Sequence, residues 1–423
     1  MRKLSTVMLL GVIVFLLCSC LNQSTDAEKG ILTKGVVYPE GSAFDDFEAR
    51  QKLVEENPVK DRFVKSVNMF SYDTMQVLFK NQTENFNYSP LSLYYALALA
   101  GTGADGETQE QMLDLMGVSS AKELSVQCGN LYRILYTDNE ISKLKIANSL
   151  WLDDDAAIKD EFVSNAAEDF YASVFPVDFA DGNAGTLMSK WISENTNGTI
   201  QPNLETKTDQ ILSIINTIYF CDEWTSRFDK DKTQDDLFHA VGNDVTVAFM
   251  NQTFGSSGFA KGENFTRSSL NLKGNGQMVF ILPNEGVSVS QLISHSDSME
   301  TLFEDGESYS GEVVWKIPKF RFDTEMDVID SLEALGITKA FDSDADFSNI
   351  TDGMACISSI IQQTHIAIDE NGVEASAFTQ IDYYGAMLPK DKAEMILDRP
   401  FLYGITAPNG TLLFVGVCND PSL

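Results

Sequence analysis

The feature that most constrains the fold is a long stretch, residues 58–423, that no second linker, repeat or low-complexity segment interrupts. Helix and strand signals are intermixed along it in irregular order. Its phenylalanines and branched aliphatic residues can fill one large core. This order predicts an α+β domain and argues against a doubly wound fold. The strand-like runs are 144–152, 211–220, 278–282, 312–322, 356–368 and 412–417.

Four helices have clear sequence signals. Ser89 followed by Pro90 is a helix start, a cap residue before a proline in the first turn, and an apolar run continues to Ala100. Two further helices, over 188–197 and 327–335, are each predicted to end at a glycine. An earlier helix presents one apolar face that consists of Phe63, Val67, Phe70 and Leu78.

The N-terminus has the pattern of an export signal. Arg2 and Lys3 precede the apolar segment 7–17, which is too short to span a bilayer. The segment ends in Leu17-Cys18-Ser19-Cys20. A leucine three residues before a cysteine, with a small residue directly before that cysteine, is similar to a bacterial lipoprotein signal. Cys20 is therefore the predicted site of lipidation.

Processing at Cys20 would divide the chain into a lipoprotein signal peptide, residues 1–19, a lipid-anchored polar tether, residues 20–57, and the domain, residues 58–423. The predicted location is the cell envelope, anchored by lipid to the outer membrane or cell surface. An ordinary cleaved signal that happens to contain cysteines is the alternative.

The chain is strongly acidic, with a formal net charge of -32. Removing residues 1–19 takes away Arg2 and Lys3 and leaves a charge of about -34. Phosphates would repel such a chain, so nucleic acid is not an expected partner. The cysteines of the domain show no metal-ligand spacing and are expected to be structural thiols, with a disulfide pair as the alternative. They are Cys128, Cys221, Cys356 and Cys418.

No enzyme motif stands out. The chain has only His239, His295 and His365, with no HExxH metalloprotease motif and no GxSxG nucleophile elbow. The acidic run 342–346 lacks the glycine and the glutamate that a calcium loop needs. We therefore expect a protein that is not an enzyme, has no catalytic residue and binds no cofactor or metal.

The segment 373–381 carries the pattern of a half-buried strand in what otherwise looks like a long exposed loop. Its residues alternate between small or apolar and mostly polar side chains. No turn or hairpin partner accompanies it, and no proline occurs before Pro389, so every amide from 373 to 388 could join a ladder. The pattern predicts a strand that lacks its partner.

Five strings of sequence resemble the serpin family, in family order from about residue 60 to Pro421. They are "NFNYSPLS" followed by "LYYALALAGTGADGETQEQM", then "SKWISENTNGTI", "INTIYFCDEWTSRFDKDKTQDDLFH", "LEALGITKAFDSDADFSNIT" and "IAIDENGVEASAFT". The resemblance implies the serpin fold, with three β-sheets, about nine helices and an exposed reactive-centre loop. It also accounts for the strand without a partner, because a serpin loop inserts into the central sheet after a protease cuts it.

The resemblance also implies site residues. The hinge at the start of the loop would consist of Glu370, Gly372, Val373, Ala375, Ser376 and Ala377, and Glu370 would pair with Lys319. The shutter and breach, where the sheet opens, would contain Ser89, Ser92, Asn216, Gln362 and Trp224. Gln362 departs from the family pattern, in which a histidine is expected.

The bond that a protease would cut follows from the register counted from Glu370. This register gives Ala386–Met387, but the segment from Glu370 to Pro400 is a few residues longer than expected. Tyr384 and Leu388 therefore stay open as neighbouring positions.

The expected partner is a target serine protease, elastase-like or subtilisin-like, with a cysteine protease as the second option. We expect a monomer that contacts a membrane only through its lipid anchor. The expected function is a serine-type endopeptidase inhibitor that acts as a suicide substrate. The alternative is a non-inhibitory serpin that acts as a surface binding or carrier protein.

Overall fold

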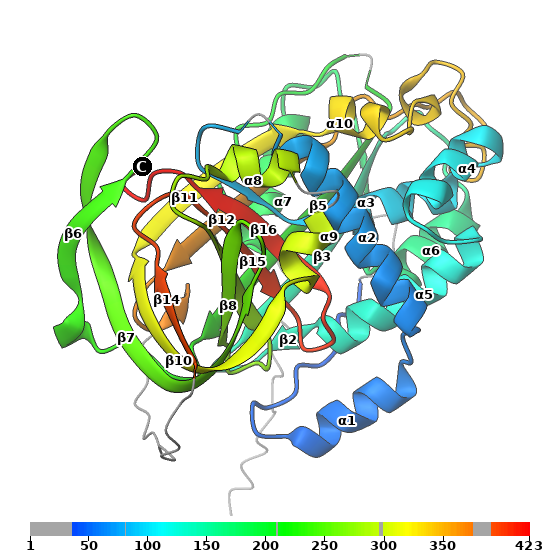
Figure 1. Ribbon diagram of the computed structural model, residues 1–423. Helices are drawn as coiled ribbons and strands as arrows, with labels where there is room; N and C mark the ends of the chain where they lie inside the picture. Colours follow the sequence, from blue (N-terminus) through cyan, green and yellow to red (C-terminus); the bar gives the residue numbers. More distant parts are fainter. Residues whose placement is uncertain (1–35, 81, 209, 296–298, 375–390) are drawn as a thin grey trace, which may run out of the picture. The chain divides into compact units, whose positions relative to one another are not determined.

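The computed structural model describes residues 36–80, 82–208, 210–295, 299–374 and 391–423 (Figure 1). Within these ranges the chain forms α-helices and two 3-10 helices together with two β-sheets. The helices are α1 (Phe47–Glu56), α2 (Asp61–Leu78), α3 (Pro90–Gly103), α4 (Gly106–Leu115), α5 (Ala121–Leu135), α6 (Asp160–Asp169), α7 (Ala184–Asn195), α8 (Val289–His295), α9 (Met299–Glu304), α10 (Ile329–Ala334), η1 (Lys230–Lys232) and η2 (Lys339–Phe341).

The helices follow the local signals of the sequence. The Ser89 side chain accepts a hydrogen bond of 3.3 Å from the Ser92 amide, which caps α3, and Pro90 occupies its first turn. Helix α7 begins at Ala184, a turn earlier than predicted, and α10 is shorter than predicted because Asp327 belongs to a strand.

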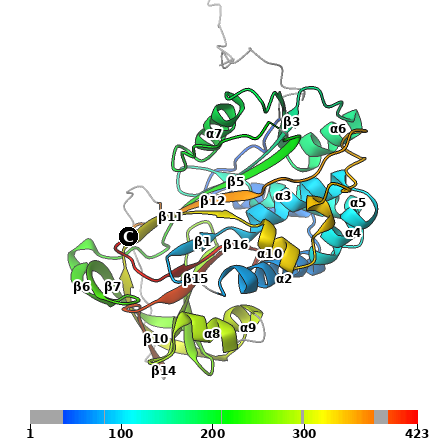
Figure 2. The same ribbon diagram turned by 90° about the horizontal axis from the view of Figure 1, so that it is seen from above.

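A seven-stranded sheet has the order β11-β12-β13-β5-β3-β2, and β4 pairs with β3. Helix α7 packs on one face of it and α3 contacts β5 and β3 from the other (Figure 2). Alternation along β3 explains the two faces, because Ala147 and Trp151 cluster with α7 while Ile146 and Leu150 join the main core. Its strands are β2 (Thr137–Asp138), β3 (Lys143–Asp153), β4 (Ala172–Val177), β5 (Leu212–Glu223), β11 (Phe320–Asp327), β12 (Ile361–Ile368) and β13 (Gly372–Val373).

A nine-stranded sheet has the order β1-β16-β15-β9-β8-β7-β10-β14, and β6 pairs with β7. The 18-residue strand β7 pairs with β6 near its start and with β8 at its end, and β10 runs beside it. The strands are β1 (Phe86–Tyr88), β6 (Gln234–His239), β7 (Asp244–Lys261), β8 (Phe265–Asn271), β9 (Gln277–Pro283), β10 (Glu307–Pro318), β14 (Asp391–Ile396), β15 (Phe401–Thr406) and β16 (Leu412–Cys418).

The predicted α+β class is confirmed, with one difference in how the sheets are counted. Three sheets were expected, whereas hydrogen bonding joins the described strands into two. The physical reason is that β7 and β10 are long enough to run through both parts of the nine-stranded sheet and so connect them. β10 bends at an irregularity between Gly311 and Val313, which lets one strand serve both parts.

Two predicted strands have different limits in the structure. The run 312–322 is divided at Lys319, whose amide donates to the Ala248 oxygen, because β10 belongs to one sheet and β11 to the other. The run 356–368 becomes a strand only from Ile361. Before that point its backbone bonds irregular segments, as where the Ile357 amide donates to the Ala340 oxygen.

The described part of the predicted tether, residues 36–57, is more ordered than a polar spacer would be. It contains α1, and the ring of Tyr38 stacks on Tyr136 at 6.2 Å between centroids. Val36 and Tyr38 pack against the core. This segment therefore belongs to the domain, because two apolar side chains within a polar run find partners on it.

Two further findings concern the cysteines and the apolar character of the helices. The four cysteines of the described residues, at 128, 221, 356 and 418, are free thiols, as the default prediction had it. Among the same described residues, no helix has both the length and the apolar character that crossing a membrane requires.

Candidate functional site

The two-residue strand β13 lies between β12 and β5 at one end of the seven-stranded sheet. Val373 pairs with Ile368 of β12 and with Asp222 of β5, and Gly372 pairs with Glu223. A Cβ at position 372 would lie 2.1 Å from the Asp222 backbone oxygen, so only glycine fits there. β13 is thus the beginning of a strand between two longer strands.

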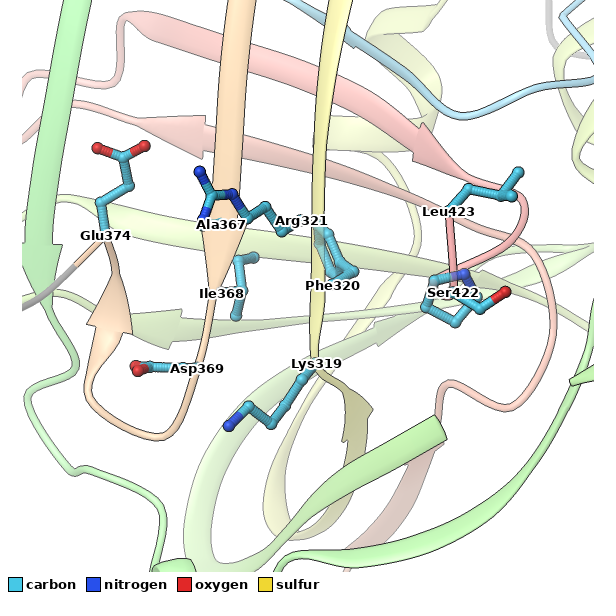
Figure 3. A pocket seen from close by; sticks show the side chains of 10 residues that line it. Lys319, Phe320, Arg321, Ala367, Ile368, Asp369, Glu374, Ser422 and Leu423 are labelled. Atoms are coloured by element: carbon cyan, nitrogen blue, oxygen red, sulfur yellow. The ribbon is translucent and has the colours of Figure 1, made fainter. Parts of the chain in front are cut away.

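A tight turn joins β12 to β13 (Figure 3). The Asp369 carboxylate accepts hydrogen bonds from the amides of Asn371, at 2.7 Å, and Gly372, at 3.3 Å. The indole of the fully buried Trp224 donates to the backbone oxygen of Asp369 at 2.9 Å, and the Trp224 amide donates to the backbone oxygen of Asn371 at 2.9 Å. The turn is therefore fixed from within and from β5.

The chain leaves the sheet at Glu374. Its amide donates to the Ala367 oxygen at 3.0 Å, but its φ is +51°, which is a left-handed conformation and not that of a strand. A groove of about 490 Å³ adjoins this point and includes Arg321, Phe320 and the C-terminal residues (Figure 3). The segment that follows, 375–390, lies outside the described residues.

A cavity of about 250 Å³ lies toward the other end of the space between β5 and β12. Its walls are the start of β5, the start of β12 and the inner side of α7, with the segment after α7 completing them. In the described part of the chain, backbone pairing connects β12 to β5 through β13 alone. The residues that line it include Ile215, Thr217, Gln363, Met188 and Ile192.

An ion pair holds the turn from the side of β11. Lys319 Nζ lies 3.0 Å from Glu370 Oε2, and Thr233 donates to Glu370 Oε1 at 2.8 Å. Burial raises the pKa of Glu370, but the hydrogen bonds from Lys319 and Thr233 outweigh it, so the pKa is below its ordinary value. The structure thus brings together the two residues that the sequence paired.

A second group of charges lies under β13. Glu223 is buried and binds Arg227 and Lys273, each at 2.7 Å. Its neighbour Asp222 accepts hydrogen bonds from the amides of Gly274 and Glu223. Burial is the largest cause that raises the pKa of Asp222, to about 7.

A network of neutral side chains joins α3 to β12 and β5. Gln362 accepts from the Ser89 amide at 2.9 Å and donates to the Ser89 oxygen at 2.8 Å. Ser92 donates to Asn216, and Asn216 donates to Asn148 of β3. The four residues predicted for the shutter therefore lie in one connected region. Gln362 uses both ends of its amide, the oxygen as acceptor and the nitrogen as donor, and unlike the histidine expected there it does not titrate.

Comparison with known proteins identifies the family. The profile of the family described as "Serpin (serine protease inhibitor)" matches residues 65–421. The chain belongs to the serpin family. An uncharacterized serpin-like protein of Methanosarcina acetivorans is 31% identical, covering 84% of this chain and 85% of that protein.

Two solved serpin structures are similar to this one. The native state of the thermophilic serpin tengpin has a TM-score of 0.77 and 28% identity, covering 91% of this chain and 97% of tengpin. A thyroxine-binding globulin in complex with thyroxine has a TM-score of 0.75, covering 85% of this chain and 99% of its own. Because that second structure is only 23% identical, it shows the fold alone. Serpins are in general inhibitors of proteases and not enzymes, in line with the lack of hydrolase motifs in the sequence.

Several predicted residues of this serpin lie outside the described residues, and their roles stay predictions. They are the lipidation site Cys20, the hinge residues Ala375, Ser376 and Ala377, and the loop residues Tyr384, Ala386, Met387 and Leu388.

The sequence did not reveal the ionisable groups that surround the hinge of this serpin. Besides Asp222, the side chain of His365 lies between two carboxylates, those of Asp323 and Glu374. The only sequence signal was that His365 falls at an outward position of the alternating strand β12, beside the strand now known to pair with it. Which partners meet there depends on the register of three strands.

Proposed function

We propose that this serpin inhibits a serine-type endopeptidase as a suicide substrate, through cleavage of its loop and insertion of the loop into the seven-stranded sheet. The observation that carries the proposal is β13, which already begins a strand between β12 and β5. An inhibitor of this kind needs a place in the sheet that is partly open and a segment that starts in the correct register. The hinge strand meets the second need and the cavity between β5 and β12 supports the first.

The pairing of β13 with β12 and its pairing with β5 both point to that cavity as the place where an inserted loop would lie. Continued in antiparallel order from Val373, they would bring residue 378 between Thr217 of β5 and Gln363 of β12. Thr217 and Gln363 both line the cavity. The register with β5 and the register with β12 therefore both bring residue 378 to the cavity.

In the proposed insertion, the same register would decide on which face of the sheet each loop residue lies. Position 378 would share a face with Thr217 and, two residues along β5, with Ile215, which packs in the cluster of α7. Phe378 would therefore meet the side of Met188 and Ile192, where an aromatic ring fits better than in the crowded core. The residues expected to face the core are small or apolar: Val373, Ala375, Ala377, Thr379 and Ile381.

The chemistry belongs to the target protease. Its serine oxygen would attack the carbonyl carbon of Ala386, the bond to the Met387 nitrogen would break, and the new amine would leave with the proton. The ester that joins Ala386 to the protease would then face two competing fates. Water would hydrolyse it, or the loop would insert first and carry the attached protease away from its reactive geometry. Small residues at this bond favour elastase-like or subtilisin-like targets.

A protease panel tests the proposal. The purified protein is mixed with elastase-like, subtilisin-like, chymotrypsin-like and trypsin-like enzymes, run on denaturing gels, and the released C-terminal peptide is sequenced. A covalent adduct together with a large rise in the melting temperature of the cleaved protein is the expected result. Cleavage in the loop with neither adduct nor stabilisation would rule out the inhibitor and favour the binding or carrier function.

We further propose that the protein is a lipid-anchored monomer of the cell envelope, on the basis of the segment Leu17–Cys20. Cys20→Ala should release the protein from the membrane fraction, while its melting temperature stays unchanged. Cys18→Ala is the matched control and should leave the protein in that fraction. Equal membrane content of the Cys20→Ala variant and the wild type would contradict the anchor.

A further inference from the structure

The imidazole of His365 bridges two strands at the point where the hinge ends. Its Nε2 lies 2.9 Å from Oε1 of Glu374, and its Nδ1 bonds Oδ1 of Asp323 on β11. The His365 side chain is only 5% exposed and that of Glu374 only 12%. A ring that bonds a carboxylate at each nitrogen donates twice, which only the protonated, charged form can do.

Glu374 is the residue that this bridge holds. Two hydrogen bonds also hold its backbone: the Glu374 amide donates to the backbone oxygen of Ala367, and the Cys221 thiol donates to the backbone oxygen of Glu374 at 3.1 Å. The φ of Glu374 is +51°. A left-handed residue other than glycine is unfavourable and persists only where its surroundings determine it. To continue into the sheet as a strand, Glu374 has to give up this conformation. His365 therefore acts on the residue where insertion would proceed.

The charges around the imidazole favour its protonated form. Burial lowers the pKa of His365, but the hydrogen bonds that the imidazole donates to Glu374 and Asp323 outweigh burial, so the pKa is above its ordinary value. Other outward charged positions of β11 on this face are Arg321 and Glu325, which lie opposite Ala367 and Gln363. From the side of β5 the facing groups are Cys221 and, beyond it, Lys143.

We propose that His365 is a positioning residue that, when protonated, holds Glu374 and with it β13 in the partly inserted state, and that releases the hinge when it becomes neutral. The hold is thus present below the ordinary imidazole pKa of 6.5, while the carboxylates are ionised, and is lost as the pH rises through the higher folded-state pKa. The consequence for inhibition rests on the proposed function, whereas the hold itself does not. In an inhibitor, release would let Glu374 adopt an extended backbone and would speed insertion.

The test is amide hydrogen exchange of the full-length protein, read at residues 373 and 374, with no protease present. At pH 6, His365→Gln should exchange at these amides about tenfold or more faster than wild type, because a charge-assisted hydrogen bond is lost. The difference between the two proteins should shrink toward pH 8. His365→Lys, which keeps the charge, should remove this pH dependence without releasing the hinge.

Two controls separate this effect from others. His239 pairs with Asp244 at 2.8 Å on the nine-stranded sheet, where both side chains are exposed, so His239→Gln removes a histidine–carboxylate pair from the other sheet and should not change the exchange. Asp222 lies opposite Val373, and burial raises its pKa to about 7, so Asp222→Asn shows which part of the pH dependence belongs to Asp222.

Equal exchange of His365→Gln and wild type at pH 6, or a difference that is the same at pH 6 and pH 8, would overturn the proposal. If His365→Gln does not fold, Glu374→Gln removes the carboxylate charge from the other side of the same contact and should accelerate exchange at pH 6 in the same direction. A hinge that behaves as proposed in a protein that forms no adduct would leave the His365 hold standing and refute only the inhibitor.

Discussion

The two ends of the space between β5 and β12 are built from different chemistry. At the hinge end the contacts are ionic: Glu370 with Lys319, Glu223 with Lys273, and His365 with Glu374. At the other end, the groups that join β12 and β5 to α3 are amides and hydroxyls, and a cavity lies beside them. The ionic contacts of the hinge end can therefore respond to pH and salt, and the neutral hydrogen bonds at the other end should not.

This difference fits what each end would have to do. The hinge end has to hold a strand that begins but does not continue, so contacts that can be released are suitable there. The other end has to admit a strand beside the cavity after the loop is cut. Neutral hydrogen bonds can be exchanged for those of a new strand without leaving a buried charge unpaired.

The largest expected effect comes from a charge on the core side of the inserting loop. Ala375 follows Glu374 and, by alternation from Val373, would face the core after insertion. Burying an unpaired arginine there costs several kcal/mol, so insertion should slow and hydrolysis of the ester should win. Ala375→Arg should be cut at the wild-type bond and at a similar rate but should form no adduct, measured by gel and by residual protease activity.

Gln380→Arg is the matched control for that substitution. Position 380 is on the opposite face by the same alternation, beside Ile215 and away from the main core, so Gln380→Arg is expected to form more adduct than Ala375→Arg. If Ala375→Arg inhibits as well as wild type, or if both variants lose inhibition equally, the loop does not insert in the register of β13.

The next effect concerns the ionic hinge end. Glu370→Lys replaces the partner of Lys319 with a like charge and removes the acceptor of the Thr233 hydroxyl. Glu370 is 6% exposed at its side chain but Lys319 is 39% exposed, so water screens part of the interaction. We expect a loss of about 2 kcal/mol in the free energy of unfolding, measured by urea denaturation.

Adding Lys319→Glu to Glu370→Lys should restore part of that loss, since the ion pair is rebuilt but Thr233 stays without its acceptor. The pH dependence has a defined sign. Because the pKa of Glu370 is lowered by folding, its stabilisation is present above the ordinary value of 4.5 and is lost as the pH falls through the folded-state pKa. A double variant no more stable than Glu370→Lys would show that the pair contributes nothing.

The sequence predicted the parts of the site that depend on local pattern and on family strings. The pairing of Glu370 with Lys319, the burial of Trp224 and the meeting of Ser92 with Asn216 all have the geometry that the strings implied. Cap residues and glycines also located α3 and the end of α7, because these signals act within a few residues.

Other features could not be read from the sequence, because they depend on how distant strands align. The bridge from His365 to Glu374 requires that β11, β12 and β13 lie in one register, and an acidic chain offers many other carboxylates as partners. The high pKa of Asp222 comes mainly from burial, and its polar sequence neighbours Cys221 and Glu223 do not predict that it is buried. The packing of residues 36–57 depends on Val36 and Tyr38, two apolar side chains in a polar run that contact the distant core.

The smallest of these effects is expected at the neutral end. Gln362→Ala removes two hydrogen bonds to the backbone of Ser89, one to its amide and one to its oxygen, and leaves both groups buried. We expect a loss of about 2 kcal/mol in the free energy of unfolding, at most as large as at the ionic end. No partner in this contact titrates, so the loss should be the same from pH 5 to pH 8, in contrast to the effect of His365→Gln on the hinge. The adjacent Gln363→Ala is the matched control. Gln363 is only half-buried and its amide bonds the exposed carboxylate of Glu325, so its removal should cost a few tenths of a kcal/mol.

A Gln362→Ala loss that grows or disappears between pH 5 and pH 8 would mean that ionic contacts reach across the whole space between β5 and β12, and that the two ends do not act separately.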